Sequence, residues 1–125
     1  YMNLIMANIY NAVEKMNEGK EGDALKIAWS RICIGSDFDG TINKLDMFGT
    51  AADFPKMAEE MESYMENPRP LDKFKPTWDT AYLKNLQCGI PAKQLTAQIM
   101  HENVELFMKK YFHDDYLKRG QVRAI

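Results

Sequence analysis

The sequence contains little that would by itself identify a partner, a metal or a compartment. Among 125 residues there are two cysteines, two histidines and a formal net charge of -2. Two cysteines are too few for the disulfide framework of a small secreted domain. The slight negative charge provides no basic surface for nucleic acid or for an anionic membrane. No apolar run approaches the roughly 18 residues of a membrane-spanning helix, so the composition predicts an ordinary soluble domain with its own core.

Most of the hydrophobic residues that are present fall at helical spacing. Apolar side chains recur at steps of three and four residues, which is the pattern of amphipathic helices. The nine methionines follow the same spacing and are expected to fill the cores between these helices. Gly19, Gly89 and the Asn67–Pro70 stretch are expected to end three of them. The predicted helices cover residues 2–17, 24–28, 53–66, 78–88 and 91–112, the last either as one helix or as two with a break near His101.

One segment has a different pattern. Trp29–Ser36 is compact, apolar and rich in β-branched residues, and it is the one clear strand that the sequence predicts. Cys33 lies within it and is expected to be a small buried hydrophobe, with a disulfide to Cys88 left open. A single strand leaves its backbone groups unpaired, so its partner must lie elsewhere in the chain or outside it. The sequence therefore predicts an α/β fold that is predominantly helical.

The predicted strand leads into the sequence DFDG, residues 37–40, for which local chemistry offers three interpretations. Two carboxylates before a glycine can form a turn by accepting from nearby backbone N–H groups. The motif also resembles the first motif of haloacid dehalogenase-like phosphatases, in which Asp37 would attack phosphorus, Asp39 would transfer the proton and Mg²⁺ would offset the phosphate charge. That fold requires several parallel strands, and no further strand-like run follows. A calcium loop with ligands at Asp37, Asp39 and Asp46 is disfavoured because Gly35 would occupy the first ligand position.

A longer match favours another family. The heptapeptide IGSDFDG, residues 34–40, resembles the end of the last barrel strand in the membrane (renal) dipeptidase family of the amidohydrolase superfamily. The segment DFPKMAEEM, residues 53–61, is similar to the helix that follows this motif in those enzymes. The segment CGIPAKQLTAQIMHENVELF, residues 88–107, is similar to their closing pattern, in which Asn103 matches an Asn of the family. The segment NLIMANIYNAVEKM, residues 3–16, resembles the helix before the last strand only loosely.

The resemblance implies a fold and the part of it that this chain represents. Residues 1–112 would be the C-terminal segment of a zinc dipeptidase built on a (β/α)8 barrel, with the last strand at about 29–36 and residues 113–125 as a tail. Such a barrel takes about 250 residues, so the chain would hold only a part of it. Two features depart from the family: residues 67–86 are an insertion, and the sequence Thr41-Ile42-Asn43 replaces a Pro-containing continuation.

The resemblance also implies a cofactor. In the family, two zinc ions at the mouth of the barrel hydrolyse dipeptides, and earlier strands supply their ligands: a His-x-Asp pair, a bridging Glu and two further His. The chain has none of these segments, and its two histidines, His101 and His113, are expected at the helix surface. The chain is thus expected to supply no metal ligand. The expected substrate is a dipeptide, and the expected partner is the remainder of the barrel. Alone, the chain is expected to be inactive.

Asp37 is the residue to which the resemblance assigns a catalytic and substrate-binding role. At the mouth of the last strand it would meet the amino group of the substrate and pass a proton to the departing amine. Asp39 is expected to orient the loop. Gly35 would let the backbone pass close to the metal pocket, and Gly40 would let the chain turn.

A non-catalytic helical module that serves packing or assembly is the competing interpretation, and the missing metal ligands favour it. In either case, helices shaped for absent neighbours and an unpaired strand edge would leave apolar surface exposed. The chain is therefore expected to associate with itself.

Overall fold

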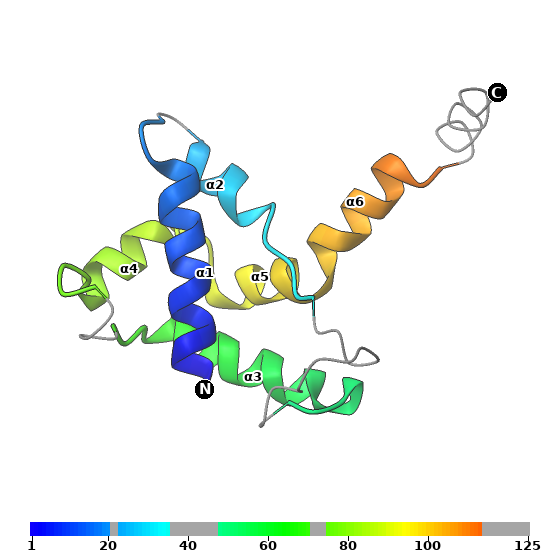
Figure 1. Cartoon of the computed structure of the whole chain (residues 1–125), viewed down its shortest axis with the longest axis horizontal. Helices are drawn as coiled ribbons and strands as arrows, with labels where there is room; N and C mark the ends of the chain where they lie inside the picture. The colour runs from blue at the N-terminus through cyan, green and yellow to red at the C-terminus, as the bar shows by residue number, and fades with distance from the viewer. Residues whose placement is uncertain (21–22, 36–47, 71–74, 114–125) are drawn as a thin grey trace.

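The helices of the protein pack around α1 (Met2–Asn17), which is the longest of them among the described residues. A computed structural model describes residues 1–20, 23–35, 48–70 and 75–113. In Figure 1, α1 runs through the middle of the molecule, and α2, α3 and α4 lie around it. The other elements of the described residues are α2 (Ala24–Trp29), η1 (Ala51–Asp53), α3 (Phe54–Glu66), α4 (Thr80–Leu86), α5 (Ala92–Ala97), η2 (Gln98–Glu102) and α6 (Asn103–Tyr111).

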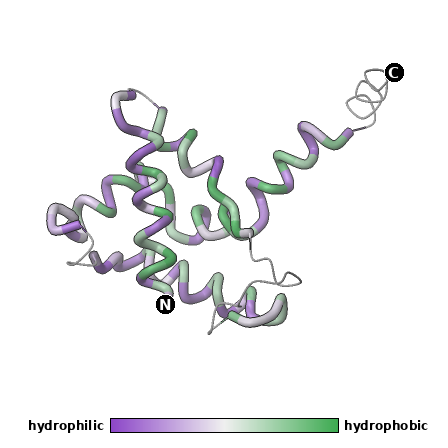
Figure 2. The backbone as a smooth tube through the Cα atoms, in the orientation of Figure 1, coloured by the Kyte–Doolittle hydropathy of each residue, from purple (hydrophilic) through white to green (hydrophobic). Residues whose placement is uncertain are grey.

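The amphipathic pattern of residues 2–17 produces a helix with the predicted bounds. Hydrophobic and hydrophilic positions alternate along α1 (Figure 2), and its apolar face is buried against α2, α3 and α4. The chain leaves the helix before Gly19, which has a φ of +70°. This left-handed conformation is available to glycine at little cost, so the prediction that a glycine ends the helix is confirmed. The buried residues of α1 are Met2, Met6, Ala7, Ile9, Tyr10 and Val13.

Side-chain hydrogen bonds cap η1, the short helix that leads into α3. The Thr50 backbone N–H donates to Asp53 Oδ2 over 3.0 Å in a capping box that precedes η1. Pro55 follows in the first turn of α3, where its missing N–H costs nothing. Three methionines of α3, at positions 57, 61 and 65, are buried, as the helical spacing of the methionines predicted.

Trp29 lies at the centre of the core and ties three helices together. Its ring meets the Tyr10 ring edge-on, with centroids 5.5 Å apart, and its Nε1–H donates to the Leu86 carbonyl over 2.7 Å. Gln87 Nε2 donates to Tyr10 Oη over 2.6 Å and to the Met65 carbonyl over 2.8 Å. Burial raises the pKa of Tyr10 to about 12, although the hydrogen bond with Gln87 acts to lower it. The Trp29 indole N–H, the Tyr10 hydroxyl and the Gln87 amide nitrogen therefore have partners, as burial requires.

The predicted strand at 29–36 is wrong. Trp29 is the last residue of α2, Ser30 and Arg31 form a turn, and residues 32–35 join no sheet. Their backbone bond to a distant segment, from Ile34 N–H, goes to the Ile99 carbonyl of η2 and not to a strand. Apolar, β-branched residues favour a strand, but here Ile32 and Ile34 bury their side chains against helices instead.

The fold prediction is corrected accordingly. The described residues form a small, predominantly helical domain with no strand and no sheet, and not the last strand and surrounding helices of a (β/α)8 barrel. The α/β class depended on one strand, and that segment is instead bonded to η2 and to Asn103 of α6. Within the described residues, no helix combines the length and the apolar character that crossing a bilayer would require.

Two further expectations are resolved by the fold. Cys33 is exposed, so the expectation that it is buried is wrong, and both Cys33 and Cys88 are free thiols. Residues 91–112 form two α-helices joined by the π-helical turn η2, and the direction of the chain changes there (Figure 1). A π turn is a recognised cause of such a change in direction.

Candidate functional site

The extended residues Ile32–Gly35 lead the chain into the DFDG sequence, and α6 holds this approach in place. Asn103, at the first turn of α6, is buried and directs its side-chain amide toward the segment. Its Nδ2 donates to the Trp29 carbonyl over 2.8 Å and to the Ile32 carbonyl over 2.7 Å. Both protons of one amide group are thereby used to fix the end of α2 and the start of the extended segment.

The π turn provides a third attachment. In an α-helix the Asn103 backbone N–H would bond to the Ile99 carbonyl, but here it donates to the Gln98 carbonyl. The Ile99 carbonyl accepts from the Ile34 N–H over 3.3 Å. The altered helical pattern therefore supplies a backbone acceptor to the extended segment. We call the contacts of Asn103 and Ile99 with Trp29, Ile32 and Ile34 the clamp. Because π turns occur often at functional sites, the clamp is the candidate site.

Of the four predicted site residues, the structure describes only Gly35. Asp37, Asp39 and Gly40 lie outside the described residues. Gly35 is described and exposed, and a Cβ at this position would meet no described atom within 4 Å. The described surroundings therefore do not require a glycine at position 35. What the structure does bring together is the two segments that carry the family resemblance, through the bond from Ile34 N–H to the Ile99 carbonyl, with Asn103 bonded to Ile32 just before the first segment.

The histidines do not form a metal centre within the described residues. His101 is exposed, and its Nδ1 lies 3.1 Å from Glu105 Oε1 on the next turn. His113 is also exposed. No group of three or more His, Cys, Asp or Glu in the described part of the chain could hold a metal ion. These described residues do not fit a zinc site.

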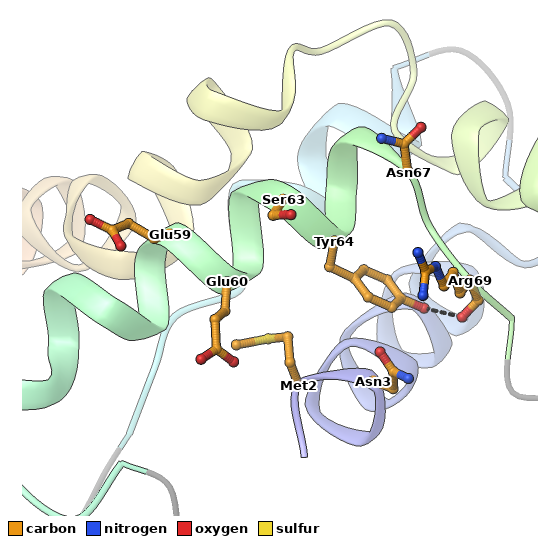
Figure 3. Close-up of a pocket in the computed structure, with 8 residues that line it drawn as sticks. All are labelled: Met2, Asn3, Glu59, Glu60, Ser63, Tyr64, Asn67 and Arg69. Carbon is orange, nitrogen blue, oxygen red and sulfur yellow. Dashed lines mark hydrogen bonds between the residues drawn. The ribbon is translucent and has the colours of Figure 1, made fainter.

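A surface pocket of about 430 Å³ lies between the start of α1 and α3 (Figure 3). Tyr64 Oη donates to the Arg69 carbonyl over 2.6 Å at one end, and Glu60 and Met2 lie at the other. The pocket is polar and mixed in charge, and it lies apart from the clamp. Sequence reasoning missed it because it joins two helices far apart in the chain. The lining residues are Met2, Asn3, Glu59, Glu60, Ser63, Tyr64, Asn67 and Arg69.

Sequence reasoning also missed a cluster of polar contacts around one carboxylate, that of Glu14 on α1. Glu14 Oε1 accepts from Trp78 Nε1 over 3.1 Å and from Tyr82 Oη over 2.7 Å, and Glu14 Oε2 pairs with Lys75 Nζ. Burial acts to raise the pKa of Glu14, but the hydrogen bonds from Lys75, Tyr82 and Trp78 together hold it below the usual value. Both oxygens of the Glu14 carboxylate thus have partners. The bond from Tyr82, which lies on α4, connects α4 to α1. Trp78 and Tyr82 share a helical spacing, but no local signal identifies the distant Glu14.

No protein-family model, curated protein or solved structure matches the chain.

Proposed function

We propose that the chain contributes Asp37 to a zinc-dependent dipeptidase-type hydrolase. The observation that supports this most is the contact between the two segments that carry the resemblance, residues 34–40 and 88–107. The Ile34 N–H makes this contact by donating to the Ile99 carbonyl. Asn103, the residue that matches an Asn of the family, holds the chain just before it by donating to the Ile32 and Trp29 carbonyls. The proposal concerns the chemistry of the loop and does not include a (β/α)8 barrel.

Asp37 has the chemistry that hydrolysis of a dipeptide requires. A carboxylate can bind the protonated amino group of the substrate through a charge-assisted hydrogen bond. It can also deliver a proton to the leaving nitrogen, which must be protonated before the peptide bond breaks. Asp39, two residues later, orients the loop. The residues that hold zinc would come from outside residues 1–125, because the chain contains only two histidines, His101 and His113, and the resemblance places the metal ligands on earlier strands.

Asn103 acts in this proposal as a positioning residue. It holds the backbone five and eight residues before the DFDG sequence and does not touch the substrate. With the Ile99 carbonyl it fixes the path of the chain into the loop at three backbone groups. A loop that is anchored in this way at its start places a carboxylate more reproducibly than a free one.

The test is hydrolysis of a dipeptide by the natural polypeptide that carries these residues, with zinc supplied. Asp37→Asn should lower turnover by roughly 10²–10⁴-fold, because an amide of the same shape cannot transfer the proton. Asp39→Asn, in the same motif, is the matched control and should cause a smaller loss. Equal turnover for Asp37→Asn and the parent would refute the role of Asp37. Mg²⁺-dependent hydrolysis of a phosphate ester, in place of dipeptide hydrolysis, would favour the phosphatase alternative.

The second candidate is a non-catalytic helical module for assembly, and a specific observation favours it. Residues of α6 expose large apolar side chains, among them Leu106 at 64% and Phe107 at 53%. No dipeptide hydrolysis in the parent polypeptide, with zinc present, would favour this candidate over the hydrolase.

A further inference from the structure

One face of α6 carries a continuous row of exposed apolar side chains. Val104, Phe107, Met108 and Tyr111 recur at steps of three, one and three residues, so they lie on one side of the helix. They expose 40%, 53%, 47% and 37% of their surfaces. The Phe107 and Tyr111 rings lie together, with centroids 4.9 Å apart. We call these four residues the α6 stripe. In Figure 1, α6 extends away from the other described helices.

Charged residues border the α6 stripe in a definite order. His101, Glu105 and Lys109 form a row along one edge, each one turn after the last. His101 Nδ1 lies 3.1 Å from Glu105 Oε1, and Lys109 Nζ lies 3.9 Å from Glu105 Oε2. The midpoint of the stripe lies between Phe107 and Met108. Glu105 therefore precedes the midpoint on this edge, and Lys109 follows it.

We propose that the α6 stripe binds the α6 stripe of a second copy of this chain in antiparallel orientation. A two-fold axis through the midpoint would place Phe107 against Met108 of the second copy and Val104 against Tyr111. The same operation reverses the charged edge and sets each Glu105 within about one turn of Lys109 of the other copy. A parallel two-fold pair would instead set this edge against the opposite edge of the second stripe, so Glu105 and Lys109 of the two copies would not face each other. The order of charges is thus complementary to itself in only one of the two orientations.

Each apolar side chain of the stripe would leave water on pairing. Exposed apolar side chains at helical spacing are the usual seam between two helices, and burying them drives association. The ion pairs at the edge contribute less, and they determine the orientation. This inference is independent of the proposed hydrolase activity, since it uses no residue of the DFDG loop.

The mass of the chain in solution, measured by light scattering over a range of concentrations, tests the pairing. A mass of twice 14.5 kDa is expected at high concentration. Phe107→Asp should weaken the dimer by more than about tenfold, because it places a charge at the centre of the seam. Leu106→Asp is the matched control: Leu106 is more exposed but lies off the stripe, and the dimer should persist. A native chain that stays monomeric, or a dimer that tolerates Phe107→Asp, overturns the proposal.

A charge exchange tests the orientation without disturbing the apolar seam. Glu105→Lys alone brings like charges together across an antiparallel pair and should weaken the dimer several-fold. The double variant Glu105→Lys with Lys109→Glu restores opposite charges and should restore the dimer. Circular dichroism verifies that each variant keeps its helix content. If the double variant dimerises no better than Glu105→Lys alone, the antiparallel pairing is refuted.

Discussion

Replacing Asn103 by alanine should destabilise the protein substantially, although the residue lies at the edge of the described core. The Asn103 amide makes two hydrogen bonds, of 2.8 and 2.7 Å, to the Trp29 and Ile32 carbonyls. Each bond of this kind contributes about 0.5–1.5 kcal/mol net, and a buried acceptor left unpaired costs about 1–3 kcal/mol. Because water can reach the partly exposed Ile32 side of the cluster, we expect a loss near the sum of the two bonds, about 1–3 kcal/mol.

Urea unfolding followed by circular dichroism measures this loss directly. A change in midpoint at constant slope would give the difference in the free energy of unfolding. Asn85→Ala is the matched control, because Asn85 lies exposed on α4, and it should change the free energy by less than about 0.5 kcal/mol.

A second measurement locates the effect. Hydrogen exchange at the Ile34 amide should accelerate in Asn103→Ala more than exchange at Leu83, which lies in the buried core. If Asn103→Ala were as stable as the parent, or if the Ile34 amide were unaffected, the clamp would not hold the extended segment. Asn103 would then not be a positioning residue.

Two further predictions follow from particular residues. The pKa of Glu14 is lower than its usual 4.5, so its contribution to stability is present above about pH 4.5 and is lost as the pH falls through the folded-state pKa. Glu14→Gln should therefore be less stable than the parent near neutral pH, and the gap should narrow in thermal unfolding measured toward about pH 3; a constant gap would refute the assignment. Gly89 has a φ of +72°, so Gly89→Ala should cost about 1–2 kcal/mol in urea unfolding, whereas Gly35→Ala, with open space and no such φ, should cost less than about 0.5 kcal/mol. Equal effects at the two glycines would contradict the backbone argument.

The helices were predictable because their signal is local. In α1 the apolar residues follow the helical period over sixteen positions, and the structure gives Met2–Asn17, the predicted bounds. The end of α4 near Gly89 and the end of α3 before Pro68 were also predicted from single residues. Such signals depend on neighbours within one or two turns, which the sequence displays directly.

The extended segment was mispredicted because its partner is distant in the chain. Ile32 and Ile34 have the composition of a strand, and only packing against the helices leaves them extended without a sheet. The acceptor for Ile34 N–H is Ile99, whose carbonyl is available because η2 has a π pattern that no local residue type announces.

The pattern of residues by itself determined which segments are helical and which face of each is apolar, because both depend on spacing along the chain. Tertiary structure alone decided which faces meet. It joined Glu14 to Lys75, Trp78 and Tyr82 across 61, 64 and 68 positions, and it placed Asn103 on the carbonyls of Trp29 and Ile32. Contacts at such separations form only when the helices have packed, since burial of their apolar faces is what brings these polar groups within bonding distance.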